Sequence, residues 1–270
     1  MTAATHGPDS PYAFNNDKPT AGSLLDALSE ILDEFSQVRL AQSGVTTGAR
    51  CLEVGAGAGS VAAWMADQVG PSGEVIALDI KPQHVRPYPG VTIQQNDVSA
   101  DPLPSGEFDV IHARAVLQHL PDREEVLAKL VGALKPGGAV VVEELEPGWS
   151  RAVLATPDPR AYDVFTAYET ALTKVLRSSG NDPMWCRRVH GVMRDLKLTG
   201  VDTQGWQRSF AGGTGQCKLA YSGSTELNDR LVAAGMAQQD LDLMRTLAMN
   251  PDLVLRGMLL LSTIGRKPVE

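Results

Sequence analysis

The sequence has few cysteines, few aromatic residues and few positive charges, and each shortage excludes a class of protein. Its 270 residues include only Cys51, Cys186 and Cys217, which lie far apart and lack the spacing of a metal site or a disulfide framework. No apolar run reaches the roughly 18 residues that a membrane span requires, and the N-terminus lacks the basic-then-apolar order of a signal peptide. We therefore expect a cytoplasmic protein with reduced thiols and no membrane partner.

The deficit of positive charge bears on the choice of partner. The chain has 24 Lys and Arg against 32 Asp and Glu, so its formal net charge is −8 and its pI is about 5.2. Nucleic-acid binding depends on clustered Lys and Arg that neutralise phosphates. We therefore predict no nucleic-acid partner. The 43% of apolar residues suffices for a packed core, and the length suits one domain with additions.

Glycine is concentrated in the most informative stretch of the chain. Gly55, Gly57 and Gly59 occur at every second position between a short apolar strand and a helix expected over 61–69. Glycine permits a tight turn and a close approach to a ligand, and the helix presents free N–H groups at its start. A second strand over 74–78 ends in Asp79, which is placed to hold the hydroxyls of a ribose. These features predict a cofactor that contains a nucleoside.

The charge beside the glycine loop favours one type of cofactor. Glu53 precedes Gly55 by two residues, where a carboxylate would repel a pyrophosphate and attract an amino group. S-adenosylmethionine carries an ammonium and a sulfonium and no phosphate. A third strand over 91–95 ends at Asp97, which can accept a hydrogen bond from an adenine amino group. An NAD-dependent reductase uses nearly the same glycine device and is the main alternative.

Two more strands complete an ordered series of motifs. They are expected at 108–114 and 134–142, and the second contains the turn Leu-Lys-Pro-Gly-Gly. Together with residues 53–59, Asp79 and Asp97, they resemble the motifs of class I S-adenosylmethionine-dependent methyltransferases over about residues 45–146. Residues 118–122, Gln-His-Leu-Pro-Asp, are similar to the subgroup that methylates small molecules, including quinone and natural-product enzymes.

The resemblance implies a cofactor site at the strand ends. Glu53 and the glycine loop would hold the methionine end, Asp79 the ribose, and Asp97 with Val98 the adenine. Ser60 is interpreted either as a ligand of the methionine carboxylate or as a helix cap. The complete set of predicted cofactor contacts is Glu53, Gly55, Ala56, Gly57, Gly59, Ser60, Asp79, Ile80, Asn96, Asp97, Val98, Ala113 and Arg114.

The expected fold is α/β. Strands and helices alternate five times over 45–146, which predicts a Rossmann-like doubly wound sheet of seven mainly parallel strands with an antiparallel last strand. Residues 1–44 are expected to form a mobile N-terminus and a lid helix, 45–146 the cofactor-binding core, and 147–270 helical cap elements with strands six and seven. The later elements are expected as helices over 159–177, 185–198, 226–234 and 237–248, and strands over 201–206, continued by 208–210, and 258–263.

An amphipathic helix is predicted over 21–42. Leu24, Leu28, Ile31 and Phe35 fall on one face of it. This face either covers the edge of the sheet or closes over the cofactor as a lid, together with aromatic residues from the segment before it. It could equally pair between subunits, so a homodimer is possible.

The reaction centre is expected near the end of the fourth strand. Transfer of a methyl group from a sulfonium needs an aligned acceptor and, for some acceptors, a base. His119 is the candidate base, or a structural histidine. Arg114 could bind an acceptor carboxylate or phosphate, or form a salt bridge with Glu143 or Glu144. Glu144 is interpreted as a pocket residue or as part of a solvated strand end.

The acceptor is expected to be a small, apolar organic molecule. Aromatic residues make up only 5% of the chain, and several of them lie in the region expected to cover the pocket. The resemblance to methyltransferases suggests secondary metabolism and no metal. Alternatives are a carboxyl methyltransferase acting on a peptide, the reductase, or a non-catalytic or cyclising protein of the same fold. The candidate substrate residues are Tyr12, Phe14, Gln118, Glu144, Trp149, Tyr162 and Trp185.

Overall fold

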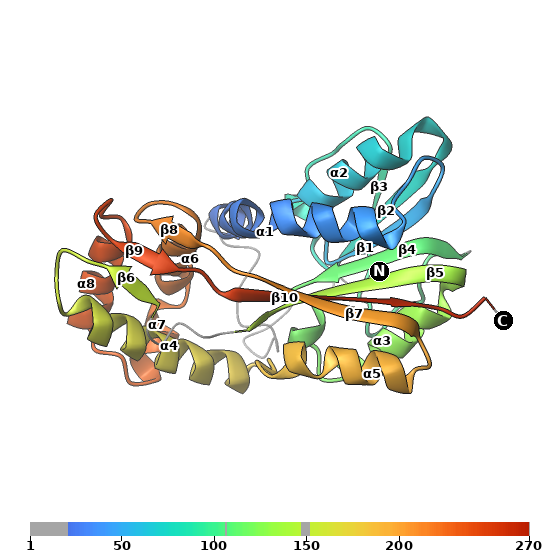
Figure 1. Ribbon diagram of the computed structural model, residues 1–270. Coiled ribbons are helices and arrows are strands. Elements are labelled where there is room, and N and C mark those ends of the chain that lie inside the picture. The colour runs from blue at the N-terminus through green and yellow to red at the C-terminus, as the bar shows by residue number, and fades with distance from the viewer. Residues whose placement is uncertain (1–20, 106, 147–151, 270) are drawn as a thin grey trace, which may run out of the picture.

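The computed structural model describes residues 21–105, 107–146 and 152–269, and a seven-stranded sheet forms its centre (Figure 1). The strand order is β3-β2-β1-β4-β5-β10-β7, and β10 alone runs antiparallel to its neighbours β5 and β7. The predicted doubly wound, mainly parallel sheet is confirmed. Its strands are β1 (Arg50–Val54), β2 (Glu74–Asp79), β3 (Val91–Gln95), β4 (Phe108–Arg114), β5 (Leu134–Glu146), β7 (Thr199–Trp206) and β10 (Leu259–Arg266).

Helices cover both faces of this sheet. α1 (Ala21–Ser43) and α2 (Ser60–Val69) lie on one face, and α3 (Arg123–Gly132) and α5 (Val189–Asp195) lie on the other (Figure 1). The inner strands are nearly continuous apolar runs because each is buried on both faces. Short 3₁₀ helices occupy the connections: η1 (Gly70–Ser72), η2 (Pro82–His84), η3 (Leu117–His119) and η4 (Trp185–Arg187).

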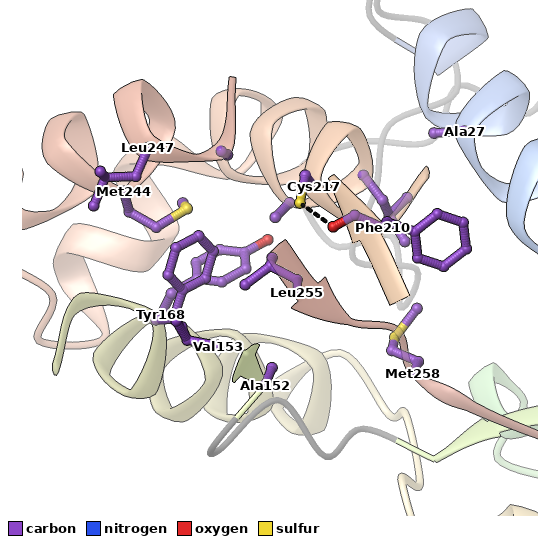
Figure 2. Packing of buried hydrophobic residues seen from close by; sticks show 14 of the residues in the cluster. Ala27, Ala152, Val153, Tyr168, Phe210, Cys217, Met244, Leu247, Leu255 and Met258 are labelled. Atoms are coloured by element: carbon purple, nitrogen blue, oxygen red, sulfur yellow. Dashed lines mark hydrogen bonds between the residues drawn. The ribbon is translucent and has the colours of Figure 1, made fainter. Parts of the chain in front are cut away.

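A second group of elements forms a cap beyond the carboxyl end of β5 (Figure 1). It contains α4 (Ala161–Ser178), α6 (Gly215–Glu226), α7 (Asn228–Ala233) and α8 (Gln238–Ala248). It also contains a three-stranded antiparallel sheet in the order β6-β9-β8, made of β6 (Val153–Ala155), β9 (Val254–Arg256) and β8 (Ser209–Ala211). Figure 2 shows side chains of the cap packing around Leu255, including Tyr168, Phe210, Cys217 and Met244.

The cap departs from the predicted elements in two ways. The sequence predicted that residues 208–210 continue the preceding strand, but Ser209 and Phe210 belong to β8 in the cap sheet. The prediction also began the next helix at 226, whereas α6 already begins at Gly215. Strands of three residues are too short to show a period, and the glycines and small residues of α6 hide its helical pattern.

Helix α1 joins the two parts of the molecule. Leu24, Ile31 and Phe35 pack in the same apolar cluster as the cap residues, while Leu40 packs with α2 and β1. Phe35 stacks on Trp206 of β7 with ring centroids 5.5 Å apart. The helix therefore folds back onto its own chain and shares the core of the cap. No helix in the described part of the chain is long and apolar enough to cross a membrane.

We predict that the small cap sheet is part of the cooperatively folded unit. Leu255 on β9 is fully buried and Leu154 on β6 is 56% exposed. Leu255→Ala should lower the free energy of unfolding by about 2–5 kcal/mol, because it removes buried methyl groups and leaves a cavity. Leu154→Ala should change it by less than about 0.5 kcal/mol. Chemical denaturation checks both, and equal effects at the two positions would contradict the packing described.

Candidate active site

The glycine loop is held in a conformation that requires glycine. Gly55, Gly57 and Gly59 have φ values of +68°, +56° and +85°, which place them in the left-handed region. The N–H of Gly55 donates to the carbonyl oxygen of Leu78 at 2.8 Å, and this bond fixes the loop against the end of β2. A Cβ atom on Gly55 would lie 2.3 Å from Cγ2 of Val116. The loop therefore leaves no room for a side chain at this position.

Asp79 is fixed beside this loop at the end of β2. Its Oδ2 accepts a hydrogen bond from the N–H of Gly57 at 2.9 Å, and its Oδ1 accepts one from the N–H of Lys81 at 2.8 Å. Burial raises the pKa of Asp79, and these two amide donors oppose the rise. The following residue, Ile80, is 40% exposed. The strand end thus presents an oriented carboxyl group next to an accessible apolar side chain.

The end of β3 carries polar groups as the sequence predicted. Oδ1 of Asp97 accepts the N–H of Ser99 at 3.0 Å. The Nδ2 group of Asn96 donates to the carbonyl of Pro102 at 3.0 Å, while its buried Oδ1 has no hydrogen-bond partner in the structure as described. Val98 is buried. An acceptor atom without a donor at a strand end is a candidate contact for a ligand amino group.

A buried imidazole links the ends of three strands. Nδ1 of His112 on β4 lies 2.6 Å from Oε2 of Glu53 on β1, and Nε2 lies 3.3 Å from Oε2 of Glu143 on β5. All three residues are 3% exposed or less. Burial alone would lower the pKa of His112, but the two carboxylates outweigh burial and raise it to about 9. The pKa of Glu143 is lowered, because its hydrogen bonds and the positive charges near it outweigh the effect of burial.

These contacts continue to helix α1. The hydroxyl of Ser36 donates to Oε2 of Glu143. The guanidinium of Arg114 donates to Oγ of Ser36 at 2.9 Å and pairs with Asp33 at 2.8 Å. The predicted alternative, a salt bridge from Arg114 to Glu143 or Glu144, is therefore corrected to a pair with Asp33. The sequence pattern did not show that the helix would supply this partner.

Glu144 is buried on the opposite face of β5 from Glu143. Its side chain has no exposed surface, so the interpretation as a solvated strand end is wrong. Oε1 accepts the N–H of Gln118 at 3.1 Å, and Oε2 has no hydrogen-bond partner in the structure as described. Burial raises the pKa of Glu144 to about 8, against the opposing effect of backbone donors and of Arg123. The group is therefore mainly protonated at neutral pH.

His119 is surrounded by amide side chains. Its Nδ1 lies 3.1 Å from Nδ2 of Asn181, and its Nε2 lies 3.3 Å from Nε2 of Gln118. Burial, with a smaller effect of Arg123, lowers the pKa of His119 to about 4. The imidazole is therefore neutral at physiological pH and is a weak base.

Comparison with known proteins shows which domain part of the chain resembles. Residues 52–142 match the family model described as a methyltransferase domain. The chain is 35% identical over 188 residues to methyltransferase str3 of Strobilurus tenacellus, covering 67% of this chain and 64% of that protein. It is 30% identical over 135 residues to the ubiquinone/menaquinone biosynthesis C-methyltransferase UbiE of Cupriavidus necator, covering 47% and 53%. This chain thus spans between half and two thirds of the length of these relatives.

Over residues 52–142, the chain thus carries a methyltransferase domain. Solved structures share its fold at low sequence identity. Phosphoethanolamine N-methyltransferase 2 of Haemonchus contortus has a TM-score of 0.57 at 14% identity, covering 97% of this chain and 61% of that chain. A cyclopropane-fatty-acyl-phospholipid synthase-like protein of Lactobacillus casei has a TM-score of 0.58 at 14% identity, covering 93% of each chain.

The methyltransferase domain brings the predicted cofactor contacts to one edge of the sheet. The glycine loop, Asp79 and Asp97 all lie at the carboxyl ends of parallel strands, where ligands bind in such sheets. Ala113 is buried near the end of β4. Ser60 does not cap its helix, since Gly59 is the capping residue, and its hydroxyl lies 3.1 Å from that of Ser29 on α1.

The predicted substrate residues are not brought together in the same way. Trp185 is fully buried in the core on the α3 and α5 face, with the guanidinium of Arg188 5.2 Å from its ring. Tyr162 is 50% exposed at the start of α4, in the cap. Gln118 is buried and contacts His119. The remaining candidates, Tyr12, Phe14 and Trp149, lie outside the described residues.

Sequence reasoning missed the residues that connect the domain to α1. They are His112, Asp33 and Ser36, together with Leu25, whose Cδ2 would lie 3.2 Å from a Cβ placed on Gly57. A histidine within a strand buried on both faces was the available signal, because it needs a buried polar partner. No group of three His, Cys, Asp or Glu side chains suited to a metal ion occurs among the residues that the structure describes.

We predict that Glu144 makes the domain less stable as the pH rises. A carboxyl with a raised pKa keeps a proton that the unfolded chain releases. Its contribution to stability is complete below the ordinary pKa of 4.5 and is lost as the pH rises to about 8. Glu144→Gln should remove this part of the decline, which reaches on the order of 1 kcal/mol per pH unit. Urea denaturation across this pH range measures it.

The control for this experiment is Glu146→Gln. Glu146 is partly exposed and pairs with Arg187, so this variant should keep the pH dependence of the wild type. His112 produces a decline of the same sign, since its raised pKa favours the folded state below about 6.5 and the effect is lost by about pH 9. The difference between Glu144→Gln and the wild type therefore isolates Glu144, and parallel curves for the two would contradict the assignment.

Proposed function

We propose that this chain transfers a methyl group from S-adenosylmethionine to a small organic acceptor, in natural-product metabolism in the cytoplasm. The observation that carries the proposal is the constellation of the glycine loop, Asp79 bonded to Gly57, and acids at the ends of β1 and β3. The named relatives support the acceptor class, because one is a C-methyltransferase of ubiquinone and menaquinone biosynthesis. The buried thiols Cys51, Cys186 and Cys217 agree with a reducing environment.

The residues present fit this cofactor. Gly55 and Gly57 form a cradle that a Cβ atom would close, against Val116 and Leu25 respectively. Oδ1 of Asn96 is a buried acceptor without a donor among the described residues, which suits an adenine amino group. Asp79 would accept hydrogen bonds from the ribose hydroxyls, and Ile80 would pack against the adenine. When bound, S-adenosylmethionine supplies an activated methyl group on its sulfonium.

The chemistry left to the protein is mainly alignment. Since His119 has a pKa of about 4 and both of its ring nitrogens lie near amide groups, it is a poor general base. The site therefore suits an acceptor that needs little removal of a proton, such as an electron-rich carbon or an acidic phenol. Holding the acceptor at near-attack distance and excluding water would supply most of the acceleration.

Two alternatives lose support from particular contacts. A peptide carboxyl methyltransferase would use Arg114 as its anchor, but that guanidinium is bound to Ser36 and Asp33. An NAD-dependent reductase would place a pyrophosphate against the glycine loop, beside the carboxylate of Glu53. His112, which is buried next to Glu53, also contacts Glu143. Its positive charge is therefore already compensated by carboxylates and is not available to bind a diphosphate.

The proposal is tested by binding and then by turnover. Calorimetry should show binding of S-adenosylhomocysteine and none of NADH. Incubation of the protein with S-adenosylmethionine and a panel of small phenols and quinols should then release S-adenosylhomocysteine together with a methylated acceptor. Tight binding of NADH alone would reject the proposed function. Binding of S-adenosylhomocysteine without transfer to any member of a broad panel would favour a non-catalytic or cyclising protein of this fold.

We predict that Asp79→Ala weakens the binding of S-adenosylhomocysteine at least about tenfold, or ~1.4 kcal/mol. The substitution removes the acceptor for the ribose and also frees the N–H of Gly57, so the loop loses one of the hydrogen bonds that hold it. Asp67→Ala is the control, because Asp67 is an exposed carboxylate of α2 that bonds only to Tyr88 among the described contacts. Calorimetry on both variants measures the effect, and equal affinities would remove Asp79 from the site.

A further inference from the structure

The imidazole of His112 is enclosed by acidic groups from neighbouring strands. Glu53 lies at Nδ1, at 2.6 Å, and Glu143 lies at Nε2, at 3.3 Å, a separation that suits an ion pair. The charged groups facing this cluster are Arg114 from β4 and Asp33 from α1, with the neutral hydroxyl of Ser36 between Arg114 and Glu143. No surface of the histidine is exposed to solvent. Its protonation state is therefore decided by these neighbours.

The two flanking carboxylates favour a charged imidazole. A neutral imidazole carries a single N–H, so one of the two flanking carboxylates would face a bare nitrogen. Glu143 would then keep only the neutral hydroxyl of Ser36 as a donor, with the charge of Arg114 behind that hydroxyl. A buried carboxylate is costly unless a counter-charge lies close to it. An imidazolium donates from Nδ1 to Glu53 and places a positive charge 3.3 Å from the carboxylate of Glu143. The geometry alone thus favours the charged form.

Glu53 connects this cluster to the glycine loop. It is the residue before Val54, and the loop begins directly after Val54 at Gly55. Because Oε2 of Glu53 is bonded to His112 and the side chain is 3% exposed, a bound ammonium group would have to share this carboxylate with the imidazole. The orientation of Glu53 is therefore set by His112 before any ligand arrives.

We propose that His112 is a positioning residue of the cofactor site: as an imidazolium shared with Glu143, it holds Glu53 in place to receive the ammonium of the cofactor's amino-acid tail. This inference rests on the proposed function for the identity of the ligand. The charge of the imidazole is independent of that function. His112 acts through Glu53 and touches neither the methyl group nor the acceptor.

A pair of ligands separates this role from general support of the fold. S-adenosylhomocysteine has the amino-acid tail, whereas 5′-methylthioadenosine keeps the adenosine and the sulfur and lacks the ammonium and the carboxylate. If His112 positions Glu53 for the ammonium, its replacement should affect only the first ligand. If His112 merely supports the sheet, its loss should weaken both ligands together.

The experiment is calorimetry of both ligands with His112→Gln. The glutamine amide can donate to one carboxylate but carries no charge, so binding of S-adenosylhomocysteine should fall about tenfold or more, while 5′-methylthioadenosine should change less than about twofold. Equal losses for the two ligands, or no loss for either, would overturn the inference. His190→Gln is the matched control, since that histidine bonds to Thr203 at 2.9 Å, and both affinities should stay at the wild-type value.

A second variant covers the case in which His112→Gln does not fold. Glu53→Gln should show the same selective loss of S-adenosylhomocysteine. Where both single variants fold, His112→Gln added to Glu53→Gln should cause little further loss, because the histidine acts through that carboxylate. Additive losses in the double variant would show that the two residues act independently and would reject the positioning role.

Nitrogen NMR of the ligand-free wild type tests the charge directly. Both ring nitrogens of His112 should carry protons at about pH 7, with deprotonation near pH 9. A neutral imidazole at pH 7 would overturn the inference whatever the ligand data show. If the wild type binds no S-adenosylhomocysteine, the proposed function fails, and this spectrum still decides the state of the histidine.

Discussion

A buried imidazolium between two carboxylates is the constraint on which this site depends. Glu53, His112 and Glu143 on three neighbouring strands are directed toward one another, and removing the imidazole would leave two buried carboxylates without the positive charge that they share. The apolar strands determine that the sheet forms, but these polar contacts add a restriction on how the strand ends are aligned. Because the glycine loop follows β1 directly, this restriction reaches the backbone that would hold the cofactor.

The same constraint explains why α1 belongs to the site. Ser36 and Asp33 tie the helix to Glu143 and Arg114, while the buried Arg39 pairs with Asp202 and bonds to Ser262 on the outer strands. The other end of the helix packs in the core of the cap. Helix α1 therefore contacts both the cap and the strands that carry the charged cluster.

The parts of this fold that the sequence predicted are those determined by local pattern. The glycine loop, Asp79 and the alternating strands and helices each depend on residues close together in the chain, so they were found. The pair formed by Glu53 and His112 joins residues 59 positions apart, and Glu53 was therefore predicted as a free anchor for the ligand. The burial of Glu144 depends on η3, the 3₁₀ helix at Leu117, and on η4. No hydrophobic period in the sequence indicates either of these short helices. The strands of the cap sheet are three residues long, too short for alternation to be visible.

The two adjacent carboxyl groups of β5 have pKa values shifted in opposite directions, because they face opposite sides of the sheet. Glu143 faces α1, where an imidazolium and Ser36 surround it and lower its pKa. Glu144 faces the other side of the sheet, where burial dominates and raises its pKa to about 8. His119 lies on that side as well and is kept neutral by burial. The face toward α1 thus holds fixed charge, which suits a charged amino-acid tail. On the opposite face, Glu144 and His119 are both neutral at pH 7, and the charge nearest to them is Arg123, which pairs with Asp182.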